Sequence, residues 1–140
     1  MNVAQDDRPL ILIVDDASSS LKVIANMLDG NGYRLALAES GVDALKFCAD
    51  RRPDLILLDI VMPDMDGFEV CRKLKESDNT ASIPVIFLNG HVDNSSVTRS
   101  YDLGGADYIT KPFNAVEIKA KVKTHLELAR LKKNPVNGKS

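Results

Sequence analysis

The fold of this chain is decided by residues 54–67, Asp-Leu-Ile-Leu-Leu-Asp-Ile-Val-Met-Pro-Asp-Met-Asp-Gly. The apolar run from Leu55 to Leu58 is too short for a buried helix and is typical of a strand covered on both faces, as in parallel sheets. It ends at Asp59, and the loop that follows contains Pro63 and Gly67. Open α/β sheets place their chemistry at the carboxyl ends of such strands, so Asp59 is the first candidate functional residue.

The same pattern recurs along the chain. Residues 10–14 and 85–88 are apolar runs that end in polar side chains, and residues 33–38 and 107–109 predict two weaker strands. Segments with apolar residues at three- and four-residue spacing separate and follow these strands. We therefore predict one doubly wound α/β domain with a five-stranded parallel sheet, five helices and right-handed crossovers.

The helices carry more detailed expectations. The expected N-terminal caps are Ser18–Ser20, Ser40 and Asn114. The residues expected to be buried by the second helix are Val42, Leu45 and Cys48. The segment 94–103 has a sparse apolar stripe, which predicts a mobile or partner-facing helix. The last helix, over 116–131, continues past the point where the sheet needs cover, and its His125 is expected to be exposed or to contact a partner.

Composition limits the possible functions. The 140 residues fit one domain, with a flexible N-terminus at 1–8, a folded part at 9–131 and a linker or tail at 132–140. The 18 Lys and Arg against 20 Asp and Glu give a net charge of −2, which does not favour direct nucleic-acid binding. Cys48 and Cys71 lack metal-ligand spacing and are expected to be packing thiols. No apolar run reaches membrane-spanning length and no signal peptide is present, so we expect a cytoplasmic protein.

The strand ends predict a phosphoryl site. Asp15 and Asp16 follow the first strand, and Asp59, Asn89 and Lys111 follow later ones, so a parallel sheet brings these side chains to one edge. Clustered carboxylates repel one another unless a cation lies between them. Mg²⁺ accepts such oxygen ligands together with phosphate oxygens, and a carboxylate can itself accept a phosphoryl group.

Three separated motifs resemble the receiver domain of two-component response regulators. They are Asp-Asp after the first strand, Leu-Leu-Asp-Ile-Val-Met-Pro-Asp-Met-Asp-Gly in the middle, and Asp-Tyr-Ile-Thr-Lys-Pro-Phe near the end. The resemblance covers roughly residues 9 to 130. It implies a flavodoxin-like sheet with strand order 2-1-3-4-5, phosphoryl transfer from a histidine kinase or phosphotransfer protein, and an effector domain or homodimer as the output.

The resemblance also implies a role for individual residues. Asp59 is the phosphoacceptor; Asp16, Asp59 and the Val61 carbonyl hold Mg²⁺ directly, and Asp15 holds it through water. Lys111 pairs with the phosphoryl oxygens, with a cis peptide before Pro112. Asn89 and Gly90 complete the site, Val61 and His91 lie where hydrolytic water is controlled, and Tyr108 matches the aromatic switch position. Phosphorylation is expected to act on a surface formed by the fourth helix, the fifth strand and the fifth helix, including Tyr101 and Tyr108.

One residue departs from the family pattern. Asn89 stands where the family has a threonine or serine whose hydroxyl bonds the phosphoryl group, and its planar amide is longer and is also an acceptor. This leaves a second hypothesis open, a phosphorylation-impaired receiver that acts as an interaction or dimerisation module. A third is a Mg²⁺-dependent phosphohydrolase, although Val61 stands where such enzymes have a second aspartate. Asp64 and Asp66 are expected to be a loop residue and a helix cap.

Overall fold

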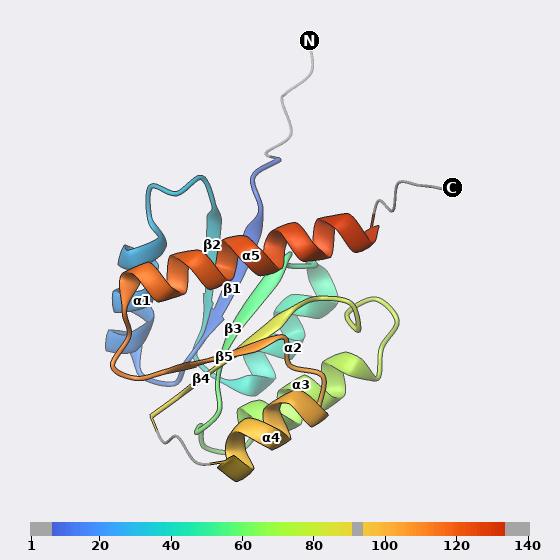
Figure 1. The fold of residues 1–140 in the computed structure, drawn as a ribbon. Coiled ribbons are helices and arrows are strands. Elements are labelled where there is room, and N and C mark those ends of the chain that lie inside the picture. Colours follow the sequence, from blue (N-terminus) through green and yellow to red (C-terminus); the bar gives the residue numbers. More distant parts are fainter. Residues whose placement is uncertain (1–6, 91–93, 134–140) are drawn as a thin grey trace.

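A computed structural model describes residues 7–90 and 94–133 as five parallel strands flanked by helices (Figure 1). The strands pair in the order β2-β1-β3-β4-β5, which confirms the predicted doubly wound fold. Their bounds are β1 Leu10–Val14, β2 Arg34–Ala38, β3 Leu55–Asp59, β4 Val85–Asn89 and β5 Asp107–Thr110. The predicted terminal segments 1–8 and 132–140 lie mostly outside the described residues, and His91 lies outside them entirely.

The helices cover both faces of the sheet, as the uninterrupted apolar strands require. Their bounds are α1 Ser18–Leu28, α2 Gly41–Asp50, α3 Gly67–Lys75, α4 Asn94–Asp102 and α5 Ala115–Lys133. Helices α1 and α5 lie on one face, and α2, α3 and α4 lie on the other (Figure 1). Within residues 7–90 and 94–133, no helix combines the length and apolarity needed to span a membrane.

Alternate residues of the central strands supply two separate cores. Leu12 and Leu58 point into the core under α2 and α3, whereas Ile13 and Leu57 point into the core under α1 and α5. Every residue of β1, β3 and β4 is buried. Each buried Leu or Ile contributes roughly 1.5–3 kcal/mol of transfer free energy, so these strands form a rigid base for the residues at their carboxyl ends.

Several local predictions are confirmed. Ser40 Oγ accepts a hydrogen bond from the Asp43 N–H at 3.0 Å and caps α2, and the Asp66 carboxylate caps α3 in the same way. Asn114 Oδ1 accepts from the third residue of α5 at 3.1 Å. Both cysteines are buried free thiols, as their apolar helical setting predicted.

Other local predictions are wrong. The first helix begins at Ser18 itself, after Ala17, and no side chain caps it. In α2 the buried face is made by Gly41, Ala44 and Cys48, whereas Val42 is 44% exposed. The reason is close packing: a Cβ at Gly41 would meet a Val70 methyl group at 2.7 Å, so only a small residue fits where α2 approaches α3.

Candidate functional site

Three carboxylates meet at the carboxyl edge of the sheet. Asp15 and Asp16 directly follow β1, and Asp59 ends β3, which pairs in parallel with β1. One oxygen from each carboxylate lies within 4.8 Å of the others. Asp15 and Asp59 are only 1% and 3% exposed, whereas Asp16 is exposed to solvent. The structure thus brings together the three predicted acidic residues in a half-buried cluster.

Lys111 faces this cluster from the end of β5. Its Nζ lies 3.5 Å from Asp15 Oδ2 and 3.6 Å from Asp59 Oδ1. The Lys111–Pro112 peptide is cis, as the resemblance implied, and the Lys111 N–H donates to the Asn89 carbonyl at 2.8 Å. The cation therefore bridges two buried carboxylates while part of its side chain remains in contact with solvent.

The environment of Asp59 makes its ionisation unfavourable. Burial raises the pKa of Asp59 from 3.8 to about 6, and the Asp15 and Asp16 carboxylates add to the rise by repulsion, while Lys111 opposes it. At neutral pH, roughly nine-tenths of the Asp59 side chains are still ionised. The Asp59 carboxylate is therefore charged at neutral pH, but Lys111 offsets only part of the cost of burial and of repulsion by Asp15 and Asp16. A further positive group would stabilise it.

The donors at this edge fit a hard divalent cation. Asp15 Oδ1 accepts a hydrogen bond from the Ala17 N–H at 2.9 Å. The other oxygen, Oδ2, is buried and finds no hydrogen-bond partner within the described part of the chain. A buried anionic oxygen without a hydrogen bond is costly, and an all-oxygen donor set is what Mg²⁺ prefers. We conclude that these residues fit the predicted Mg²⁺.

The loop after Asp59 is held against the site by its backbone. The Ile60 N–H donates to Leu88 at 3.1 Å, and the Gly67 N–H donates to the Ile60 carbonyl at 2.8 Å. A Cβ at Gly67 would overlap the Asp59 carbonyl oxygen and lie 2.9 Å from the Ile60 Cα. Glycine is therefore required where α3 begins, because its close approach fixes the backbone that carries Asp59. Val61, on the same loop, is 66% exposed.

The remaining predicted residues lie on β4 and β5. Asn89 ends β4 and is 3% exposed, and its Nδ2 donates to the Tyr108 hydroxyl at 2.9 Å. Tyr108 is itself only 8% exposed. Gly90 lies beside Lys111, and a Cβ there would make only an ordinary contact of 3.9 Å with the lysine side chain. Asn89 was expected at the site and Tyr108 at the aromatic switch position, but a direct hydrogen bond between them was not predicted.

A charged network on α5 was also missed. Asp107, the first residue of β5, accepts from Lys121 at 3.1 Å and lies 2.9 Å from His125 Nε2. The His125 side chain is only 14% exposed because α5 packs it against Asp107 of β5, so the expectation that it is exposed is wrong. The helical spacing of Lys121 and His125, one turn apart, could have signalled a shared partner.

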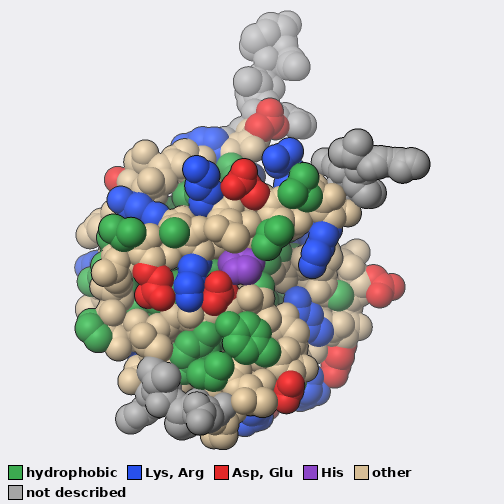
Figure 2. All heavy atoms as spheres, viewed as in Figure 1, with side chains coloured by type: hydrophobic (Ala, Val, Ile, Leu, Met, Phe, Trp, Pro, Cys, Tyr) green, Lys and Arg blue, Asp and Glu red, His purple; other side chains and the backbone are tan. Residues whose placement is uncertain are grey.

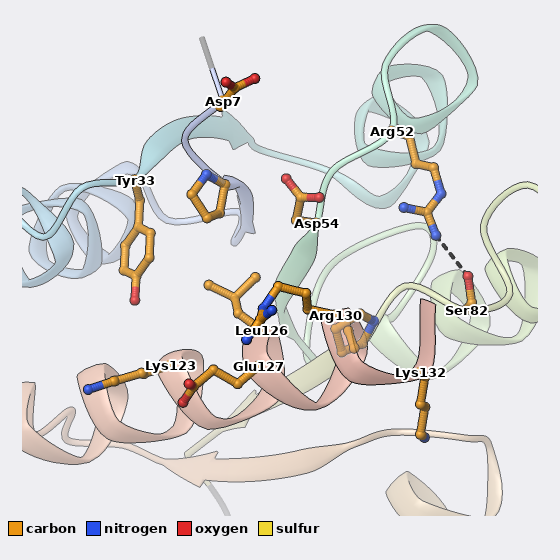
Figure 3. Close-up of a pocket in the computed structure, with 13 residues that line it drawn as sticks. Asp7, Tyr33, Arg52, Asp54, Ser82, Lys123, Leu126, Glu127, Arg130 and Lys132 are labelled. Atoms are coloured by element: carbon orange, nitrogen blue, oxygen red, sulfur yellow. Dashed lines mark hydrogen bonds between the residues drawn. The ribbon is translucent and has the colours of Figure 1, made fainter. Parts of the chain in front are cut away.

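A hollow in the described part of the chain lies away from the carboxylate cluster. It has a volume of about 610 Å³ and is formed at the amino ends of the strands, opposite the carboxylate cluster (Figure 3). Pro9, Asp54 and Pro84 line it just before β1, β3 and β4, and the last turns of α5 form its other wall. None of the residues that line it belongs to the predicted phosphoryl site, so this hollow is a separate feature of the molecule.

Comparison with known proteins identifies a family that matches most of this chain. The family model described as response regulator receiver domain matches residues 11–123. A probable cyclic di-GMP phosphodiesterase from Vibrio cholerae is 41% identical over 87% of this chain and 27% of its own length. The transcriptional regulatory protein AfsQ1 from Streptomyces coelicolor is 35% identical over 84% of this chain and 51% of its own length. The chain thus spans between a quarter and about half of these relatives.

A solved structure shows the same fold. The signal receiver domain of a signal transduction histidine kinase from Syntrophus aciditrophicus superimposes with a TM-score of 0.79 at 38% identity, covering 85% of this chain and 90% of that one.

Proposed function

Because this chain belongs to the response regulator receiver domain family of two-component signalling, we propose that Asp59 accepts a phosphoryl group from a phosphohistidine of a partner kinase or phosphotransfer protein. The observation that carries the proposal is the convergence of Asp15, Asp16 and Asp59 opposite Lys111. These four side chains come from three different strand ends, and their shared position gives a nucleophile, a cation site and a fixed positive charge.

The transfer follows from the properties of Asp59. One carboxylate oxygen attacks the phosphorus atom, the phosphorus–nitrogen bond to the donor imidazole breaks, and an acyl phosphate forms on Asp59. The carboxylate must be ionised to attack, and a pKa of about 6 keeps it so at neutral pH while leaving it poorly compensated. The negative charge of the acyl phosphate then lies within reach of the Lys111 ammonium group.

The remaining residues position and neutralise the incoming group. Lys111 lies 3.6 Å from Asp59 and supplies a positive charge on the side where phosphoryl oxygens arrive. Asp15, Asp16, Asp59 and the Val61 carbonyl are the proposed holders of Mg²⁺, which when bound supplies charge neutralisation for the phosphoryl oxygens. Because the Ala17 N–H donates a hydrogen bond to Asp15 Oδ1, this carboxylate is held in place before any ligand binds.

The output is proposed to be the α4–β5–α5 surface, defined here by Tyr101, Tyr108, Asp107, Lys121 and His125. Tyr101 is 48% exposed on this surface. Phosphorylation at Asp59 would favour one of two arrangements of this surface and so alter binding of a partner, either an effector domain or a second copy.

A labelling experiment tests the proposal. The protein is incubated with Mg²⁺ and acetyl phosphate, and the phosphorylated fraction is measured on a phosphate-affinity gel. Slow labelling that disappears in Asp59→Asn but persists in Asp64→Asn, an exposed residue of the same loop, supports the proposal. Absence of labelling would overturn the phosphoacceptor role and favour the interaction-module alternative. Many turnovers on organic phosphates would instead indicate a phosphohydrolase.

A further inference from the structure

A buried hydrogen bond joins the proposed phosphoryl site to the proposed output surface. Asn89 Nδ2 donates to the Tyr108 hydroxyl at 2.9 Å, and both residues are less than a tenth exposed. In the β4–β5 ladder Asn89 is opposite Thr110 and Tyr108 is opposite Phe87. Residues two apart on a strand share a face of the sheet, so the two side chains meet as a diagonal pair on the same face.

The bond depends on the length of the asparagine side chain. A serine or threonine hydroxyl is attached directly to Cβ, whereas the asparagine amide lies one atom further out and donates through a planar nitrogen. Breaking the bond would lose the net free energy of a buried hydrogen bond, which is unfavourable. Asparagine at position 89 therefore fixes the tyrosine in a way that the family's hydroxyl residue cannot copy from the same backbone position.

Tyr108 is in turn fastened to α5. Its N–H donates to the Asp107 carboxylate at 2.8 Å, and its carbonyl accepts from Lys121 Nζ at 2.9 Å. The same carboxylate also binds Lys121 and His125. Figure 2 views the molecule from the side of α5, where acidic and basic side chains surround a histidine beside a hydrophobic patch. The backbone of Tyr108 is thus bonded to charged side chains of the α4–β5–α5 surface, while its hydroxyl is bonded to Asn89.

We propose that Asn89 keeps Tyr108 buried whether or not Asp59 is phosphorylated, so that the α4–β5–α5 surface is set before phosphorylation and responds weakly to it. The inference rests on the proposed function, because it names how that site is coupled to its output. Asn89 is a positioning residue here, since it acts through Tyr108. A typical net hydrogen-bond contribution corresponds to a roughly 2- to 12-fold bias toward the buried ring position.

The position of the Tyr108 ring tests the inference directly. The chain contains three tyrosines, so ¹³C-labelled tyrosine rings give few NMR signals, and Tyr108→Phe assigns the one of interest. Spectra are recorded with and without Mg²⁺ and beryllofluoride, a stable mimic of a bound phosphoryl group. We expect the Tyr108 signal to move at least about twofold less in the native protein than in Asn89→Thr, consistent with the bias of one hydrogen bond. An equal or larger movement in the native protein would overturn the inference.

Two controls separate the possible failures. Tyr33→Phe removes a tyrosine hydroxyl beside the core under α1 and α5, on the opposite face of the sheet from Tyr108, and should leave the Tyr108 signal unchanged. Labelling of Asp59 by acetyl phosphate is measured on the same samples: loss of labelling defeats the proposed function. The spectra without any phosphoryl mimic test the Asn89–Tyr108 bond independently. There, Asn89→Thr should raise the exposed population of the Tyr108 ring about 2- to 12-fold, and an unchanged population would show that Asn89 does not hold the ring.

Discussion

Replacing Asp59 by asparagine should stabilise the protein at neutral pH. The amide mimics the protonated carboxyl in size and hydrogen bonding but cannot ionise. A carboxyl whose pKa rises from 3.8 in the unfolded chain to about 6 in the folded protein costs ~3 kcal/mol to ionise on folding. Since Asp59 is 3% exposed, solvent screens little of this cost, and we expect the free energy of unfolding of Asp59→Asn to exceed that of the native protein by ~3 kcal/mol at about pH 7.5.

The effect must depend on pH in one direction. Between about pH 4 and pH 6 the folded protein binds more protons at Asp59 than the unfolded chain does, so stability contributed by this group falls as pH rises through that window. The native protein and Asp59→Asn should therefore be about equally stable near pH 4 and should diverge up to about pH 6, above which the difference stays constant. Asp64→Asn, in the same loop, serves as the matched control and should show no such divergence.

Urea unfolding in EDTA at several pH values measures the difference. The chain has no tryptophan, so far-UV circular dichroism is the appropriate signal. Addition of Mg²⁺ should then stabilise the native protein, by ~2.7 kcal/mol at a hundredfold excess over its dissociation constant, and leave Asp59→Asn much less affected. A difference between the two proteins that is flat with pH, or an asparagine variant that is less stable at neutral pH, would refute the electrostatic reasoning.

Four further substitutions test other parts of the structure. Gly67→Ala places a Cβ against the backbone at the end of β3 and should lower the free energy of unfolding by about 2–3 kcal/mol, whereas Gly90→Ala should change it by less than about 0.5 kcal/mol in the same urea assay. Burial acts to raise the pKa of Asp107, but hydrogen bonds such as that from His125 lower it overall. Asp107→Asn should therefore cost about 1–3 kcal/mol above about pH 4 and progressively less below it, as urea unfolding across pH will show. Asp16→Asn should weaken Mg²⁺ binding at least about tenfold, measured as the shift in thermal midpoint with Mg²⁺ concentration.

The strands and their polar ends were predictable because local sequence determines them. An apolar run as short as Leu55–Leu58 can be buried on both faces only in a sheet between helices, so the parallel arrangement and the position of Asp59 follow together. The caps at Ser40 and Asp66 were predictable for a similar reason, since each side chain bonds the backbone three residues later. These features depend on contacts between near neighbours or on one simple rule of sheet geometry.

The errors arise where packing between elements that are distant in the sequence determines which side chains are buried. The face of α2 was assigned from apolar spacing, which favoured Val42, but the helix buries Gly41 and Ala44 instead. The close approach of Val70 from α3 leaves no room for a larger residue at position 41. His125 was expected to be exposed or to contact a partner. Its partner Asp107 comes from β5, 18 residues away, and only the three-dimensional path of α5 brings them together.

The carboxylate cluster and the Asn89–Tyr108 bond impose different requirements on the same edge of the sheet. Asp59 lies on β3 among like charges, so its state changes when a cation or a phosphoryl group changes the local charge. The Asn89 bond spans β4 and β5, joins two uncharged groups and is buried, and it includes neither the carboxylates of the cluster nor the Lys111 ammonium group. Chemistry at Asp59 can therefore be retained while its control over Tyr108 is reduced, because the two depend on separate interactions. This physical separation is what makes a receiver that accepts a phosphoryl group, yet presents its output surface in advance, consistent with the structure.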